Sequence, residues 1–446
     1  MDAPKPELVS GIDSAWLHMD EPANRMVVTL VLIFEHRLPR HALDEVLQHR
    51  LVHLPRFRQR IVDGPEGPQW EEDPNFHIYR HVNEVALEDP FDESELQRLV
   101  SRLMSRSFNR SRPLWHLYLV PHYRRGSALI ARIHHCIGDG LGLIYVFLSL
   151  ADKPDGKDDS RFLACVSAAS PAPVTSGLLD AATATVSGLG RAALGGTFSF
   201  ARLLTIGADE QTPLKGTLGI EKRATWSTPV PLEDVKAASR ALGVTVNDVL
   251  VTAATGALRN YLLSRGADVD GIEVRGVVPV NLRRAEDSHE LGNRFGLVFL
   301  SLPVGLTKPQ DRLQSICRRM RALKDSYEPV MTFQILQVLG LAPRGILERA
   351  IDFFGEKATA VITNVVGPRE PVTFAGVRLS RVMFWVPCAG RLGVGISILS
   401  YAGFVSIGFA TDAGLVPDPE CIVQGFDGEL ARLIKRASQA QIGVPV

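Results

Sequence analysis

Apolar and polar positions along the first 150 residues predict a domain of mixed helices and strands. Residues 26–34 (MVVTLVLIF) are β-branched and continuously apolar, which is typical of a strand buried on both faces. Residues 41–53 and 94–104 place apolar groups at helical spacing. Two more strands are expected at 114–120 and 128–133, where short apolar runs are bounded by polar residues.

A second regular region follows Thr217. Its helices are expected at 232–242 and 246–265. Its strands are expected at 273–280, 297–302, 360–364 and 393–399. The chain shows no short tandem repeat, so a repeat architecture is not expected.

The stretch between these regions has a different character. It begins with ADKPDGKDDS, which is polar and rich in turn formers, and continues with mainly Ala, Gly, Ser and Thr. We therefore expect an N-terminal domain at 1–151, an interdomain linker at 152–215 and a C-terminal domain at 216–446. Weakly amphipathic helices within 178–204 favour interdomain packing over an interfacial contact with lipid.

Composition narrows the classes of function. A chain of 446 residues exceeds the usual size of a single core, in agreement with two domains. Lys plus Arg equals Asp plus Glu at 49 each, so no net field attracts nucleic acid or an anionic membrane. Any lipid contact must then be mainly apolar.

The same sequence features lead us to expect a cytoplasmic protein. The five cysteines form no CxxC pair and lie far apart, which is typical of a reducing compartment. The N-terminal residues MDAPKPELVSGIDSAW lack the basic start and apolar core of a secretory signal. No apolar run reaches the roughly 18 residues that a spanning helix needs, so the protein is expected to be soluble or peripheral.

The residues from His134 to Gly140 (HHCIGDG) form an HHxxxDG motif between an expected strand and an expected helix. Neighbouring side chains of an extended backbone point to opposite faces, so one histidine faces a substrate and the other packs behind it. Gly138 and Gly140 allow the loop to turn tightly and to approach a ligand. An imidazole with an ordinary pKa of about 6.5 suits a base that works at neutral pH.

Other interpretations of these residues are less favoured. A single histidine is usually a satisfied core or surface residue, but here the pair comes with Asp139 and two glycines at fixed spacing. Two histidines and a carboxylate can bind zinc or iron, yet adjacent histidines on opposite faces are poor co-ligands, so no metal is expected. The chain has no GxSxG elbow and no P-loop, and the glycines at 188 and 190 follow no strand that would make a dinucleotide loop.

The HHxxxDG motif is shared by several coenzyme-A-dependent acyltransferases and by the condensation domains of peptide synthetases. Further motifs resemble those of the wax ester synthase/diacylglycerol acyltransferase family over nearly the whole chain. These motifs are GIDSAW (11–16), PLW (113–115), TVNDV (245–249), LGNRFG (291–296) and NVVGP (364–368). The chain departs from the family where it reads MVVT at 26–29 and NVVGP in place of Asn-Val-Pro-Gly-Pro, which bears on the acceptor rather than on the reaction type.

The resemblance implies an α/β (α+β) fold of two chloramphenicol-acetyltransferase-like domains, with a central tunnel that reaches His135 from both sides. It implies a long-chain acyl-CoA-dependent O-acyltransferase that makes triacylglycerol, wax esters or both. Acyl-CoA is then a co-substrate, no cofactor is bound permanently, and the acceptor is diacylglycerol or a long-chain alcohol. Expected locations are the cytoplasm, the inner face of a membrane and the surface of lipid inclusions.

The chemistry assigns a role to each candidate residue. An acyl thioester is already activated, so the missing element is a base for the alcohol proton, and we assign this role to His135. His134 and Asp139 are expected to support the loop, Asp139 through a buried ion pair or a helix cap. The resemblance places Asn247 at the active centre, where its amide orients the acceptor or binds the oxyanion, although Asn247-Asp248 also fits a helix N-cap.

Weaker candidates complete the site. Gly138, Gly140 and Asn364 are expected near the substrate, and Arg283 and Arg284 are candidates for the coenzyme A phosphates. The apolar residues 333–347 and 351–354 suit a tunnel, a membrane face or an ordinary core. Two alternatives stay open: an acyltransferase of the same superfamily with an amine or carrier-bound acceptor, and a non-catalytic lipid-binding protein.

Overall fold

The computed structural model describes residues 7–152, 206–282, 293–324, 326, 328–340, 342–388 and 390–441. Most of the expected linker at 152–215 lies outside the described residues, as do Arg283 and Arg284. The expected boundaries at 151 and 216 therefore stay a prediction.

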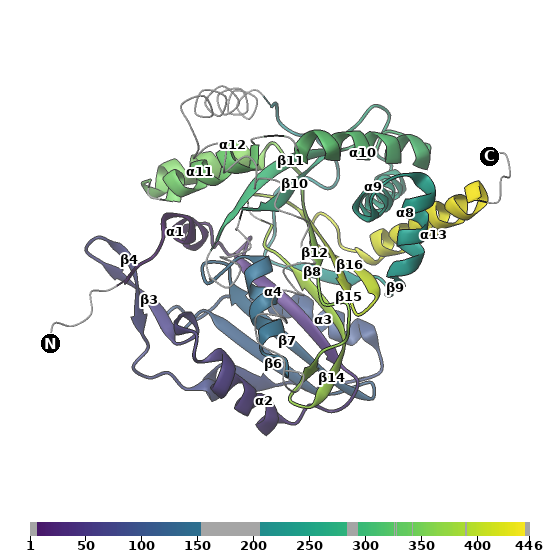
Figure 1. The fold of residues 1–446 in the computed structure, drawn as a ribbon. Coiled ribbons are helices and arrows are strands. Elements are labelled where there is room, and N and C mark those ends of the chain that lie inside the picture. The colour runs from purple at the N-terminus through teal and green to yellow at the C-terminus, as the bar shows by residue number, and fades with distance from the viewer. Residues whose placement is uncertain are drawn as a thin grey trace, which may run out of the picture.

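Two large β-sheets organise the molecule, one in the lower half of Figure 1 and one in the upper half. The lower, six-stranded sheet runs in the order β13 (Thr373–Phe374), β14 (Val377–Trp385), β2 (Val27–Phe34), β7 (Gly126–His134), β6 (Trp115–Tyr123) and β5 (Val82–Glu84). The upper sheet runs in the order β11 (Phe295–Leu302), β10 (Val274–Asn281), β12 (Ala360–Val366), β15 (Val394–Tyr401), β16 (Phe404–Asp412) and β8 (Lys222–Trp226), with β9 (Val230–Pro231) also on β16. A small sheet is formed by β1 (Glu7–Leu8), β4 (Gly67–Glu72) and β3 (Gln59–Gly64).

Helices pack around both sheets (Figure 1). Those of the first 152 residues are α1 (Gly11–His18), α2 (Arg40–Val46), α3 (Glu93–Met104) and α4 (Gly140–Ser149). Those of the second half are α8 (Leu232–Leu242), α9 (Val246–Ser264), α10 (Pro309–Lys324), α11 (Glu328–Gly340), α12 (Arg344–Gly355) and α13 (Glu420–Gln441). Helices α8, α9 and α13 gather at the right of Figure 1, whereas α11 and α12 lie together at the upper left, above α1.

The apolar runs predicted the central strands of both large sheets and several of the helices. Each expected strand is present, as β2, β6, β7, β10, β11, β12 and β15, and α3, α8 and α9 match their expected ranges. The helix expected at 41–53 is wrong in its second half, because α2 ends at Val46 and a π-helical turn continues over Leu47–Leu51. Leu47 and Leu51 of this wider turn are both buried in the core.

The six-stranded sheet includes chain from both halves of the sequence. Strand β14 pairs antiparallel with β2, with Trp385 opposite Thr29 and Val382 opposite Leu32. Strand β2 pairs on its other side with β7, where Val27 lies opposite His134. The continuously apolar β2 is therefore a central strand, as its sequence predicts, and it connects a C-terminal strand to the histidine pair.

A buried ion pair joins two helices of the upper half. Arg312 on α10 donates from Nη2 to Oε2 of Glu429 on α13 at 2.5 Å, and each side chain is only 2% exposed. Arg312 Nη1 also donates to the carbonyl oxygens of Leu306 and Thr307. Removing one member of such a pair leaves a buried charge without its counter-ion.

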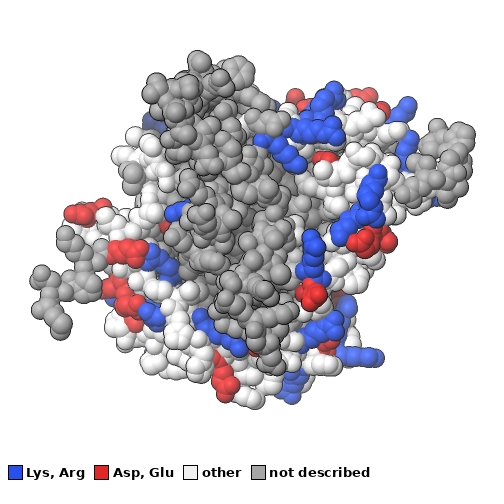
Figure 2. Space-filling model, in the orientation of Figure 1, with Lys and Arg blue, Asp and Glu red and all other residues white. Residues whose placement is uncertain are grey.

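The surface carries charges of both signs, in agreement with the equal numbers of acidic and basic residues in the sequence. Figure 2 shows basic and acidic side chains interspersed over the described part of the visible face. Among the described residues, no single helix combines the length and the apolar composition needed to cross a membrane; α8 and α9, which meet at 98°, pass that test only when taken together.

We expect Glu429→Ala to lower the free energy of unfolding by about 3–5 kcal/mol, because it strands the Arg312 guanidinium inside the protein. Glu420→Ala, on an exposed residue in the first turn of the same helix, is the matched control and should cost less than about 1 kcal/mol. Urea denaturation followed by circular dichroism measures both values. Equal destabilisation by the two substitutions would contradict a structural role for the buried pair.

Candidate active site

An apolar pocket lies where the two large sheets meet, and the HHxxxDG loop closes one side of it. Helix α1, the loop after β7, strands β10, β11 and β12, helices α11 and α12, and the segment after β14 all contribute to its wall. The pocket contains about 1380 Å³ of space, including the part open to solvent.

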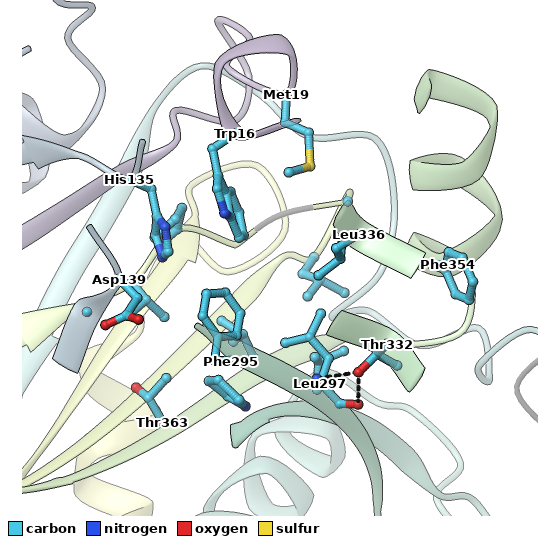
Figure 3. Close-up of a pocket in the computed structure, with 18 of the residues that line it drawn as sticks. Trp16, Met19, His135, Asp139, Phe295, Leu297, Thr332, Leu336, Phe354 and Thr363 are labelled. Carbon is cyan, nitrogen blue, oxygen red and sulfur yellow. Dashed lines mark hydrogen bonds between the residues drawn. The ribbon is translucent and has the colours of Figure 1, made fainter. Parts of the chain in front are cut away.

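The ionisable side chains of the pocket, His135 and Asp139, lie at one side of it. In Figure 3, His135 and Asp139 lie opposite the apolar side chains of Leu336 and Phe354. Thr332 also lines the pocket, but its hydroxyl is engaged with the backbone of Leu297, since it accepts from the amide at 2.7 Å and donates to the carbonyl at 2.9 Å. The arrangement suits a ligand with a long apolar body and a reactive polar group.

His135 is held rigidly by its neighbours. Its backbone amide donates to the carbonyl of Met26 at 2.8 Å. The Trp16 ring stacks on the imidazole with ring centroids 4.1 Å apart and an angle of 27° between the planes. Phe295 meets the imidazole edge-on at 5.8 Å. The side chain is only 3% exposed and lines the pocket.

Burial sets the protonation state of His135. It lowers the pKa of the imidazole to about 4, because the charged form loses its hydration, while the negative charge of Asp139 acts in the opposite direction. The imidazole is therefore neutral near pH 7 and has a lone pair that can accept a proton.

His134 is turned away from the pocket. Its amide donates to the carbonyl of Leu114, and its Nδ1 accepts a hydrogen bond from the Cys136 amide at 3.2 Å. Burial lowers the pKa of this imidazole to about 3. Because Nδ1 is an acceptor and the ring is neutral, His134 contributes to the packing and shape of the loop.

Asp139 begins the helix that follows the loop. Its Oδ1 accepts from the Gly142 amide at 2.7 Å, which makes it the N-cap of α4, and its Oδ2 accepts from the Arg294 amide at 3.3 Å. The carboxylate also reaches the pocket wall. Of the two structural roles expected for Asp139, the structure shows the helix cap.

The two glycines of the motif lie in the same tight loop. Gly138 lies in the loop before α4, and Gly140 is the first residue of α4 and lines the pocket. A Cβ atom at position 140 would lie 2.8 Å from Cγ1 of Val386, so glycine is needed for this close approach.

Asn247 and Asn364 are brought together from distant parts of the chain. Asn364, on β12, donates from Nδ2 to Oδ1 of Asn247 at 2.8 Å, and Asn364 lines the pocket. Asn247 lies in the first turn of α9, but the cap of that helix is Thr245, which forms a capping box with Asp248. The capping hydrogen bonds therefore involve Thr245 and Asp248, and the Asn247 side chain is directed to Asn364 instead.

Several residues around His135 were not assigned from the sequence. Trp16 and Phe295 contact the imidazole, Met19 lines the pocket, and Asn293 Nδ2 donates to the His135 carbonyl at 2.8 Å. All four lie in or beside the GIDSAW and LGNRFG motifs, and these motifs were the feature of the sequence that could have indicated them.

The apolar segment expected to form a tunnel, a membrane face or a core has two kinds of side chain. Some line the pocket: Ile335, Leu336, Leu339, Leu347, Ile351 and Phe354. Others are exposed, namely Val338, Ile346 and Phe353, which are 69%, 54% and 41% accessible. Within the described part of the chain, no three His, Cys, Asp or Glu side chains come together as a metal site.

Comparison with known families identifies related sequences over most of the chain. The model of the wax ester synthase/diacylglycerol acyltransferase catalytic domain matches residues 9–250, and that of the WS/DGAT C-terminal domain matches residues 291–434. A probable diacylglycerol O-acyltransferase of Mycobacterium tuberculosis strain H37Rv is 28% identical over 412 residues, which cover 89% of this chain and 88% of the relative. A putative diacylglycerol O-acyltransferase of the same strain is 26% identical over 468 residues and 98% of each chain.

Solved structures share the fold. The wax ester synthase/diacylglycerol acyltransferase from Marinobacter aquaeolei VT8 superposes with a TM-score of 0.71 at 21% identity, over 97% of this chain and all of that one. The starter condensation domain of rhizomide synthetase, in complex with C8-CoA, gives a TM-score of 0.58 at 14% identity, over 98% and 95% of the two chains. The expected two-domain, chloramphenicol-acetyltransferase-like architecture is confirmed. The chain belongs to the wax ester synthase/diacylglycerol acyltransferase family and is an O-acyltransferase.

Proposed function

We propose that the protein transfers a long acyl chain from coenzyme A to the hydroxyl of diacylglycerol or a long-chain alcohol, with His135 as general base. The observation that carries this proposal is a neutral, buried imidazole at the wall of a mainly apolar pocket. The names of the mycobacterial relatives support a diacylglycerol acceptor. The C8-CoA bound to a structural neighbour supports an acyl-CoA donor.

The reaction needs one proton acceptor and no acyl-enzyme. The hydroxyl proton passes to His135, the alcohol oxygen attacks the thioester carbonyl carbon, and the carbon–sulfur bond then breaks. The imidazolium returns its proton to the departing thiolate, which leaves as coenzyme A. Trp16 and Phe295 hold the ring in place and keep water from the imidazole during this exchange.

The Asn247–Asn364 pair supplies further amide groups, and Asn364 itself lines the pocket. Since Asn247 accepts through Oδ1, its Nδ2 group is the end available to donate. This end orients the acceptor or stabilises the oxyanion of the tetrahedral intermediate. Asn364, as a pocket residue, holds Asn247 toward the substrate.

Helices α11 and α12 provide the route for lipid. Their inner side chains line the pocket, and their outer faces expose Val338, Ile346 and Phe353. We infer that these faces contact a membrane or a lipid inclusion from the cytoplasmic side. With a formal net charge of zero, the contact relies on apolar burial and not on attraction to anionic headgroups.

We expect His135→Ala to lower acceptor-dependent release of coenzyme A by about 10²–10⁴-fold, the range typical of general-base catalysis. Thiol release from palmitoyl-CoA is measured with hexadecanol, with dioleoylglycerol and without acceptor. His122→Ala, on an exposed histidine, is the matched control and should retain wild-type activity.

Circular dichroism shows whether each variant is folded, and His135→Gln is a second variant that keeps a polar side chain. Undiminished turnover in either folded His135 variant would overturn the role of His135. Release with an amine or carrier-bound acceptor alone would indicate the alternative acyltransferase, and binding without turnover would indicate a lipid-binding protein.

The pH at which kcat/KM falls on the acid side should also be unusually low. Burial disfavours the imidazolium and lowers the pKa of His135 to about 4, and the reaction needs the neutral ring, so kcat/KM should stay level from pH 7 downward and fall only as the pH approaches 4. The measurement is kcat/KM against pH at constant ionic strength, over the range in which circular dichroism shows a folded protein. A fall centred near an ordinary histidine pKa of about 6.5 would contradict a buried base.

A further inference from the structure

One hydroxyl of the pocket wall has only long hydrogen bonds. Among the described residues, two threonines contribute hydroxyls to this wall, Thr332 and Thr363. Thr332 is engaged with the backbone of Leu297 at 2.7 and 2.9 Å. Thr363 Oγ1 reaches Ser397 Oγ at 3.2 Å and the Ile396 carbonyl at 3.4 Å. Hydroxyl donors normally approach their acceptors to about 2.5–3.0 Å, so the Thr363 hydroxyl is weakly held and can turn to a substrate.

Strand β12 presents Thr363 to the reactive side of the pocket. Alternate residues of a strand share one face, and Val361, Thr363 and Val365 all line the pocket. Val365 packs in the same buried cluster as Trp16, whereas Val361 packs in a cluster that includes side chains of α11 and α12. Figure 3 shows Thr363 on the side of the pocket where His135 lies. The hydroxyl therefore lies between the imidazole and the apolar end.

The proposed reaction creates a charge that needs such a donor. When the alcohol oxygen attacks the thioester carbon, the π electrons of the carbonyl group move to its oxygen, which becomes an oxyanion. A mainly apolar pocket solvates this charge poorly, so a donor that is already in place lowers the energy of the transition state. The base His135 is occupied with the alcohol proton, and the Asp139 carboxylate accepts from two backbone amides.

We propose that Thr363 is a catalytic residue whose hydroxyl donates a hydrogen bond to the oxyanion of the tetrahedral intermediate. The hydroxyl keeps its proton throughout: the contact weakens when the carbonyl re-forms and the carbon–sulfur bond breaks. Ser397, which is paired with Thr363 on β15, can donate to Thr363 Oγ1 at the same time, because a hydroxyl both donates and accepts. The inference rests on the proposed function and leaves Asn247 to orient the acceptor.

We expect Thr363→Val to lower kcat by about 10²–10³-fold, the loss that is typical when one oxyanion donor is removed. Valine has nearly the shape of threonine and suits a strand, so the change removes the hydroxyl and preserves the packing. The KM for palmitoyl-CoA should change little, because the donor acts mainly on the transition state. Thr363→Ser keeps a hydroxyl and should retain most of the activity. Thiol release with dioleoylglycerol measures both parameters.

Thr255→Val is the matched control. Thr255 is a fully buried residue of α9 outside the pocket wall, and its hydroxyl donates to the Val251 carbonyl at 2.8 Å. This variant also loses a buried hydroxyl, but it should keep the kcat of the wild type. Equal losses in Thr255→Val and Thr363→Val, or in Thr363→Ser and Thr363→Val, would overturn the inference.

Infrared spectroscopy of bound palmitoyl-CoA, labelled with carbon-13 at the carbonyl and without acceptor, tests the contact itself. The hydroxyl that meets the oxyanion also reaches, more weakly, the carbonyl oxygen of the bound thioester. A hydrogen bond lowers the carbonyl stretching frequency, so this frequency should be lower in wild type and in Thr363→Ser than in Thr363→Val. A purely structural role of Thr363 predicts equal frequencies, and this result would overturn the inference. Thr363→Ala replaces Thr363→Val if circular dichroism shows that the latter is unfolded.

The His135 variants separate this inference from the proposed function. Full turnover in folded His135→Ala would overturn the proposed function itself. Loss of turnover in His135→Ala, together with the wild-type kcat in Thr363→Val, would overturn only the role of Thr363.

Discussion

Burial of the His135 imidazole at the meeting point of the two sheets is the constraint on which the rest of the site depends. Withdrawal from water holds the ring neutral, so that it can accept a proton at neutral pH. It also requires other groups to replace the lost solvent. Trp16 and Phe295 provide apolar contact, and the backbone of Met26 fixes the loop. Helix α1 therefore contributes a side chain to the pocket as well as to the core.

The pocket combines contributions that no single domain supplies. Strand β7 presents the histidine, β10, β11 and β12 form one wall, and α11 and α12 cover the apolar end. Chain from the segment after β14 closes the remaining side. A site built at such a seam has walls from both sheets around one polar point, which agrees with the acyl-transfer chemistry of the family.

The sequence predicted the features that depend on local pattern. Apolar runs located β2, β7 and β12, and the HHxxxDG spacing located His135. Strand β14 was missed because its sequence VRLSRVMFW mixes polar and apolar residues and its partner β2 is about 350 positions away. The same reason hid Trp16 and Asn293, since only the folded chain brings them to His135. The π-helical turn at Leu47–Leu51 keeps a helical apolar pattern, so it could not be distinguished from an α-helix.

The pairing of β14 with β2 has a consequence during synthesis of the chain. Translation delivers β2, β7 and β6 long before residue 385 leaves the ribosome, so the apolar strand β2 waits with one edge unpaired. Exposed edges of this kind pair readily with other chains. The nascent protein is therefore most vulnerable to aggregation in the interval before its last quarter emerges, and a chaperone that shields this edge would improve its yield.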